Sequence, residues 1–216
     1  MELNKYIEHT LLKQDATLES VQKLLEEAVK HRFLGVCVNP CNVAFAKQFL
    51  KDTDVKIVTV IGFPLGQSTT EVKILETIDA VKNGADEIDM VINVGKLKDK
   101  NYDYIVEEIS KIKTACQEHS LKVIIETDLL TKDEIKTACE LCIKGGADFV
   151  KTSTGFVKNG VGAKAEDVKL MYETVKDSGL HVKASGGIRD KETALKMIEM
   201  GATRLGTSSG CKIMES

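Results

Sequence analysis

The chain has 216 residues, which suits a single domain with a sizeable hydrophobic core. It is 43% hydrophobic and 29% charged, and its net charge of −3 comes from interspersed lysine and glutamate rather than from charged blocks. This pattern argues against a nucleic-acid partner, and no apolar run approaches the roughly 18 residues of a membrane span. The first residues do not open a signal peptide. We therefore expect one cytoplasmic domain over residues 1–216, with no membrane partner.

Eight short apolar runs predict β-strands. They lie at residues 5–10, 34–38, 55–61, 86–92, 121–126, 147–151, 180–184 and 203–207. Amphipathic helical patterns lie between them, one of which has an i, i+3, i+4, i+7 stripe of Val21, Leu24, Leu25 and Ala28. Two further helices are expected to begin with capping boxes, which are Ser68-x-x-Glu71 and Thr131-x-x-Glu134.

One phrase recurs before three of these strands: Gly-Ala followed by Asp or Thr begins at residues 84, 146 and 201. Each glycine follows a helical pattern, which is typical of a left-handed helix terminus that leads into a buried strand. Alternating β and α units indicate a parallel sheet covered by helices. Eight of them predict an α/β fold, a compact single-domain (β/α)8 TIM barrel. An open doubly wound sheet is disfavoured because no Gly-x-Gly-x-x-Gly follows the first strand.

The six cysteines are spread through these strand and helix patterns. Cys139-x-x-Cys142 has the spacing of a metal or redox pair, but neither a second pair nor a nearby histidine accompanies it. It falls within a helical pattern, where residues i and i+3 share a face. This favours buried, reduced thiols, and we expect no metal ion and no organic cofactor.

Two lysines stand inside predicted strands, Lys151 in FVKTSTG and Lys183 in HVKASGG. A buried lysine is costly unless it is paired or takes part in chemistry. A free lysine is neutral in only about one molecule in 2,500 at pH 7, so it is a poor nucleophile. Burial and a second cation within about 4–6 Å can lower a lysine pKa to near 7. Either lysine alone fits a surface ion pair equally well, whereas the pair predicts an amine that attacks a carbonyl.

Strand alternation allows four side chains to point into one barrel mouth: Lys151, Lys183, Asp89 and Glu126. Carboxylates placed there can transfer protons. The loops after the seventh and eighth strands contain Ser185-Gly186-Gly187 and Thr207-Ser208-Ser209-Gly210. Barrels often bind phosphate in these loops, and small residues let backbone N–H groups close around an anion. Together, the lysines and the loops predict Schiff-base chemistry on a phosphorylated sugar.

At this level of detail the sequence resembles the class I, Schiff-base-forming deoxyribose-phosphate aldolases. The matching stretches occur in the family's order and span nearly the whole chain: IEHTLL (7–12), GVCVNP (35–40), VTVIGFPLG (58–66), GADEIDMVIN (84–93), KVIIET (122–127), GADFVKTSTG (146–155), KASGGIR (183–189) and GTSSG (206–210). The resemblance implies a lyase, an aldehyde-lyase that reversibly cleaves 2-deoxy-D-ribose 5-phosphate to D-glyceraldehyde 3-phosphate and acetaldehyde.

The resemblance also implies roles for individual residues. Lys151 would form the Schiff base, Lys183 would depress the pKa of that lysine and take part in proton transfer, and Asp89 would transfer protons around the carbinolamine. The phosphate-binding candidates are Gly186, Gly187, Ser208 and Ser209, with Gly155 as a further one.

The chain departs from the family pattern in two places. Glu8 stands where the family usually has aspartate, so it is left outside the catalytic set. The chain does not end in the tyrosine that closes some members and contributes to proton transfer. Cys37 matches a family cysteine near the site and is interpreted as a packing residue with some sensitivity to aldehydes.

Two other functions stay open. Another Schiff-base barrel, such as a transaldolase or a keto-acid aldolase, would share the lysines, and a keto-acid enzyme would need an arginine for which Arg189 is the candidate. A non-catalytic barrel that senses a sugar phosphate would need only the phosphate loops. The sequence leaves a homo-oligomer open as well.

Overall fold

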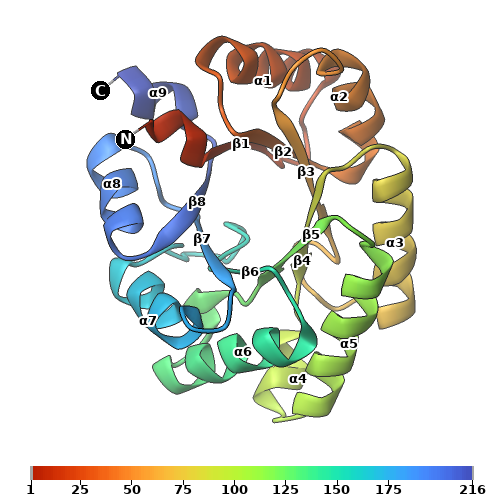
Figure 1. Cartoon of the computed structure of the whole chain (residues 1–216), viewed down its shortest axis with the longest axis vertical. Helices are drawn as coiled ribbons and strands as arrows, with labels where there is room; N and C mark the ends of the chain where they lie inside the picture. Colours follow the sequence, from red (N-terminus) through yellow and green to blue (C-terminus); the bar gives the residue numbers. More distant parts are fainter. Residues whose placement is uncertain (1, 216) are drawn as a thin grey trace.

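The computed structural model describes residues 2–215, and its eight parallel strands close into a barrel in which each strand pairs with the next and β8 pairs with β1. Figure 1 looks into this ring of strands, with the helices outside it. The strands are β1 Ile7–Leu11, β2 Gly35–Val38, β3 Lys56–Ile61, β4 Glu87–Val91, β5 Ser120–Ile124, β6 Phe149–Lys151, β7 His181–Ser185 and β8 Ala202–Thr207. The predicted (β/α)8 fold is confirmed.

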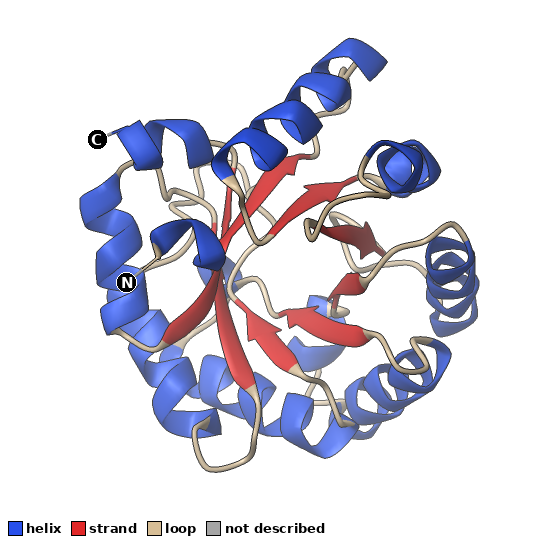
Figure 2. Ribbon diagram, turned by 45° about the horizontal axis from the view of Figure 1, so that its top comes forward, coloured by secondary structure: helices blue, strands red, loops and turns tan. Residues whose placement is uncertain are grey.

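Helices cover the outer face of the barrel, as the blue ribbons around the red strands show in Figure 2. The α-helices are α1 Leu18–His31, α2 Val43–Phe49, α3 Thr70–Lys82, α4 Val94–Lys98, α5 Tyr102–Ala115, α6 Lys132–Gly145, α7 Ala165–Val175, α8 Lys191–Glu199 and α9 Gly210–Glu215. Short 3-10 turns lie at η1 Leu3–Tyr6, η2 Pro40–Asn42 and η3 Thr127–Leu129. Within residues 2–215, none of these helices has the length and apolar character that crossing a bilayer requires.

Local sequence signals explain most helix boundaries. The α1 stripe from Val21 to Ala28 is buried against the barrel. Thr131 and Glu134 form the predicted reciprocal capping box at the start of α6. The Ser68 capping box is wrong, because α3 is capped by the hydroxyl of Thr69, which accepts a hydrogen bond from the Val72 N–H. This shift of one residue places Glu71 too early in the helix to complete a box.

The three Gly-Ala phrases also act as predicted. Gly84, Gly146 and Gly201 have φ values of +103°, +78° and +105°, which a side chain rarely permits. Each ends a helix and leads into the strand that follows. The cysteines of the described chain are all free, and Cys139 and Cys142 are buried in α6.

The two faces of the sheet bury different kinds of side chain. Outward-facing residues such as Val123 and Val150 pack against the helices in the main hydrophobic core. A smaller apolar group inside the barrel consists of Leu12, Cys37, Val58 and Val60. Charged side chains occupy much of the remaining interior, where a barrel more commonly holds branched apolar residues.

Candidate active site

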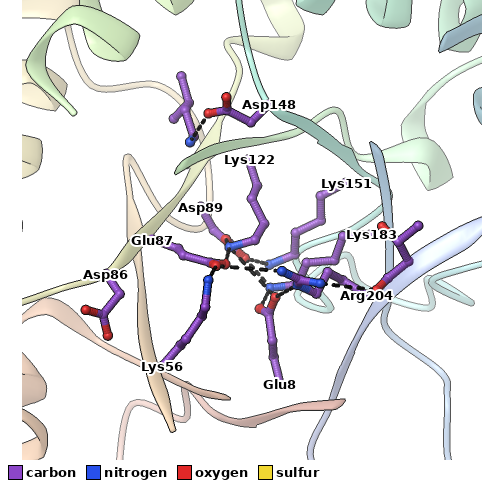
Figure 3. A network of polar contacts seen from close by, with 12 residues as sticks. Glu8, Lys56, Asp86, Glu87, Asp89, Lys122, Asp148, Lys151, Lys183 and Arg204 are labelled. Carbon is purple, nitrogen blue, oxygen red and sulfur yellow. Dashed lines mark hydrogen bonds and ion pairs between the residues drawn. The ribbon is translucent and has the colours of Figure 1, made fainter. Parts of the chain in front are cut away.

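Lys151, Lys183 and Asp89 meet inside the barrel (Figure 3). Lys151 and Lys183 are direct neighbours in the pairing of β6 with β7, so their side chains project inward side by side. Each amine donates to the same carboxylate oxygen, Oδ2 of Asp89, at 2.6 Å. Two donors on one oxygen lie within the ~4–6 Å over which like charges affect each other's protonation. The convergence expected from strand alternation is therefore present for these three side chains.

A third buried lysine, Lys122 on β5, joins this cluster and was missed in the sequence analysis. Its amine lies 3.1 Å from Oδ1 of Asp89 and 2.5 Å from Oε2 of Glu87. Lys122 also interrupts an apolar strand at an inward position, which is the signal that identified the other two lysines. The absence of a hydroxyl- and glycine-rich segment directly after it made it less conspicuous.

Glu8 on β1 also belongs to the cluster, although the sequence reasoning left it out of the catalytic set. Its side chain is fully buried, and its Oε2 accepts a hydrogen bond from the Lys183 amine. The other oxygen, Oε1, lies 3.5 Å from Nε of Arg204 and 3.8 Å from the Lys122 amine. Glu8 therefore lies between the Lys183 amine and the positive charges of Lys122 and Arg204.

Charge pairing dominates the protonation of these groups. Burial alone would raise the pKa of Asp89, but the three surrounding lysines, Lys122 foremost, hold it well below its usual range. Burial alone would lower the pKa of Lys183, but Asp89 and Glu8 together raise it above the ordinary lysine value. Lys122 behaves in the same way, with its pKa raised by Asp89 and Glu8 against the effect of burial. Buried charges of this kind persist because they are paired.

Glu126 lies near the mouth but does not join the lysines. Strand β5 ends at Ile124, two residues earlier than predicted, and Glu126 has a left-handed φ of 60°. Its carboxylate accepts hydrogen bonds from the backbone N–H and the hydroxyl of Thr154. Burial raises the pKa of Glu126 above its usual value. The turn at the strand end, which alternation cannot anticipate, directs this side chain to the loop after β6.

Above the lysines, a pocket opens at the carboxyl ends of the strands. Of the three lysines around Asp89, Lys151 alone is among the described residues that line it. Lys183 and Asp89 have no exposed surface and lie beneath. Several other predicted residues line the pocket, namely Gly155, Gly186, Gly187 and Ser208, and Lys13 and Arg189 add positive charge. Ser209 is not among the lining residues; its backbone N–H donates to the Thr207 hydroxyl at the start of α9.

The loops that form this pocket are tied together by short hydrogen bonds. The Thr152 hydroxyl donates to the Ser185 carbonyl and accepts from the Ser185 N–H, both at 3.0 Å. Gly186 and Gly187 follow with φ values of +82° and +75°. A Cβ on Gly187 would lie 2.4 Å from the Val161 carbonyl oxygen, so only glycine fits this approach. These contacts fix the loop after β7 close to Lys151.

Two other groups bear on the chemistry. Cys37 is buried inside the barrel, and burial raises the pKa of its thiol to about 11, which keeps it protonated at neutral pH. His9, Glu27 and Cys211 place potential metal-ligand atoms within 4.8 Å of one another. This group is separate from the lysines, since His9 faces away from the interior and pairs with Glu27 of α1 at 2.8 Å.

Comparison with known proteins supports the resemblance over the whole chain. Residues 4–215 match the model of the DeoC/LacD family aldolases. The deoxyribose-phosphate aldolase of Finegoldia magna is 56% identical over 215 residues, with 100% of both chains covered. That of Enterococcus faecalis is also 56% identical, with 99% of this chain and 96% of the relative covered.

Solved structures agree with these sequence relatives. The tetrameric deoxyribose phosphate aldolase of Aeropyrum pernix superposes with a TM-score of 0.89 at 33% identity, with 99% of this chain and 90% of that chain covered. An aldolase called QR15 superposes with a TM-score of 0.94 at 44% identity, with 99% and 94% covered. The chain belongs to the DeoC/LacD family of aldolases.

Proposed function

We propose that this protein is a deoxyribose-phosphate aldolase, which cleaves 2-deoxy-D-ribose 5-phosphate reversibly to D-glyceraldehyde 3-phosphate and acetaldehyde. One observation carries the proposal: a buried lysine, Lys151, lines a pocket while a second lysine, Lys183, donates to the same oxygen of its carboxylate partner Asp89. The names of the full-length relatives supply the substrate.

In the proposed reaction, the neutral amine of Lys151 adds to the aldehyde carbon of the open-chain sugar. The resulting carbinolamine loses water to form a protonated Schiff base at C1, which withdraws electrons from the carbon–carbon bond between C2 and C3. The sugar hydroxyl next to that bond loses its proton, the bond breaks, and its electron pair remains as an enamine on Lys151. Glyceraldehyde 3-phosphate leaves. Protonation of the enamine carbon and hydrolysis then release acetaldehyde and restore the amine.

Asp89 and Lys183 are the proposed proton-transfer groups. Both lie next to the Lys151 amine, so either can exchange a proton with the carbinolamine hydroxyl that forms there. Lys183 also provides the positive charge that disfavours a second ammonium at Lys151. Asp89 contacts both amines through one oxygen and holds them in place.

The proposed phosphate subsite consists of four small residues that line the pocket, which are Gly155, Gly186, Gly187 and Ser208. Arg189 and Lys13 supply charge for the dianion. Ser209 stays a prediction, in which its hydroxyl would reach the phosphate from the start of α9.

The proposal is tested by adding acetaldehyde and borohydride, which reduces a Schiff base to a stable secondary amine. Peptide mapping should find the adduct on Lys151, and turnover should be seen with deoxyribose 5-phosphate. An adduct on a different residue, or none, would contradict the mechanism. Arg189 in the pocket is the one observation that favours a keto-acid aldolase instead, and cleavage of a phosphorylated keto acid in preference to deoxyribose 5-phosphate would establish that alternative.

Two further expectations concern the state of the protein. A cytoplasmic location is consistent with its free cysteines. The relative from Aeropyrum pernix is tetrameric, and we expect this chain to associate with itself too. Light scattering coupled to size-exclusion chromatography measures the mass of the assembly directly.

A further inference from the structure

The three lysines around Asp89, which are Lys122, Lys151 and Lys183, do not share the interior carboxylates equally. Lys122 has three of them within 3.8 Å, which are Glu87, Asp89 and Glu8. Lys183 has two, Asp89 and Glu8. In the described chain, Lys151 pairs with Asp89 alone. Asp89 is itself shared by all three amines. Lys151 therefore has the least negative charge next to its amine.

Glu8 makes the difference between the two lysines that stand side by side. Lys151 and Lys183 contact the same oxygen of Asp89 at the same distance of 2.6 Å. Only Lys183 also donates to Oε2 of Glu8. Glu8 is fully buried on β1 and is not among the residues that line the pocket. It is therefore placed to act on Lys183 rather than on a substrate.

Glu8 is itself held in place by cations below it. Its Oε1 faces Arg204 and Lys122, at 3.5 Å and 3.8 Å. Glu87 extends the array further, with Lys56 2.8 Å from its Oε1 at the more exposed amino-terminal end of the barrel. The Phe149 ring lies beneath Lys122 and Arg204, 5.7 Å and 5.3 Å from their charges. Figure 3 shows the charged side chains of this array converging between the strands.

An ammonium group in a dry interior keeps its proton in proportion to the negative charge around it. Two amines that differ by one buried carboxylate must therefore differ in proton affinity. The amine that contacts two carboxylates therefore holds its proton more tightly. The raised pKa of Lys183, in which Asp89 and Glu8 outweigh the effect of burial, agrees with this geometry.

We propose that Glu8 is a positioning residue that keeps Lys183 protonated in the free enzyme and thereby leaves Lys151 as the amine that becomes the nucleophile. This inference rests on the proposed Schiff-base function and deepens it. It accounts for how two neighbouring lysines of similar environment take different roles. It also gives a role to a glutamate at a position where the family pattern led us to expect aspartate.

The direct test follows the two amines by NMR in protein labelled with 13C-lysine, with assignments from Lys151→Arg and Lys183→Arg. In the native chain, the Cε signal of Lys183 should keep its ammonium position beyond the pH at which the Lys151 signal moves. In Glu8→Gln, the Lys183 signal should titrate at or below about pH 10.4, the ordinary lysine value. Glu8→Asp keeps the carboxylate and should restore the native order.

Glu87→Gln is the matched control. It makes the same chemical change at a buried glutamate of the same array, but Glu87 contacts Lys122, Lys56 and Arg204 rather than Lys183. The Lys183 signal should stay at its ammonium position in this variant. Turnover should follow the NMR result: Glu8→Gln should lower kcat by about tenfold or more with KM nearly unchanged, and Glu8→Asp should recover most of the loss.

The outcomes separate this inference from the proposed function. If acetaldehyde is trapped on Lys151 but the Lys183 signal titrates identically in the native chain and Glu8→Gln, the role of Glu8 is refuted and the aldolase function stands. If the titration order is as expected but nothing is trapped on Lys151, the proposed function fails, and of this inference only the effect of Glu8 on the Lys183 proton stands. Should Glu8→Gln not fold, the native titration still decides, because loss of the Lys183 proton before that of Lys151 overturns the inference.

Discussion

Replacing Lys183 by methionine should suppress Schiff-base formation at Lys151 near neutral pH. Methionine keeps an unbranched side chain of similar length, so the change removes mainly the charge. Two ammonium groups about 5 Å apart repel by about 3 kcal/mol at an effective dielectric constant of 20. That energy corresponds to about two pH units, or roughly a hundredfold change in the neutral fraction of an amine. Asp89 and Glu8, freed of one cation, would act on Lys151 in the same direction.

The assay is the rate of borohydride trapping with acetaldehyde, measured from pH 6 to 10. We expect the midpoint of the trapping profile in Lys183→Met to move upward by about two units, with most of the rate recovered at high pH. Circular dichroism checks the fold, and Lys176→Met, which removes a surface lysine paired with Glu173, is the control. A folded Lys183→Met protein with the native trapping profile would refute the electrostatic reasoning.

Three further predictions concern stability, the phosphate subsite and metal dependence. Burial alone would raise the pKa of Glu87, but Lys122 and Lys56 lower it to about 2. The stability that this pairing contributes is therefore fully present above the unfolded pKa of 4.5 and is lost as the pH falls towards 2. Urea unfolding at several pH values should show this progressive loss. Gly187→Ala should raise KM for deoxyribose 5-phosphate about tenfold or more, because the added Cβ would displace the loop after β7. Cleavage of unphosphorylated deoxyribose should change little. Equal losses with both substrates would argue against a phosphate role. Activity should survive dialysis against EDTA, because lysine and carboxylate groups carry out each proposed step. A loss of activity that is restored by adding zinc would contradict this expectation.

Strand order and strand direction could be predicted from the sequence because each βα unit carries its own signals. The apolar runs, the α1 stripe and the Gly-Ala phrases are local, and local sequence decides backbone conformation at such points. Predictions that depended on a single residue of register were weaker. The α3 cap moved from Ser68 to Thr69, and β5 ended before Glu126. Alternative helix caps and strand ends differ little in free energy, so contacts with neighbouring residues decide which one forms.

The candidate site was partly visible for the same reason. Lys151 and Lys183 were identified because each interrupts an apolar strand just before small residues. Lys122 and Glu8 were not assigned to the site, although both are fully buried beside Asp89. A charge within a strand pattern indicates that it needs a partner. It does not indicate which of several distant charges that partner is.

The sequence by itself determined the barrel, the family and the two lysines at neighbouring strand ends, since periodicity and motifs are properties of contiguous residues. Only the closed barrel decided how the charges are shared. Closure brings β1 next to β8 and places Glu8, separated from Lys183 by most of the chain, against that amine. The protonation of a buried amine depends on every charge within a few ångströms in space. The division of roles between Lys151 and Lys183 is therefore a property of the tertiary structure.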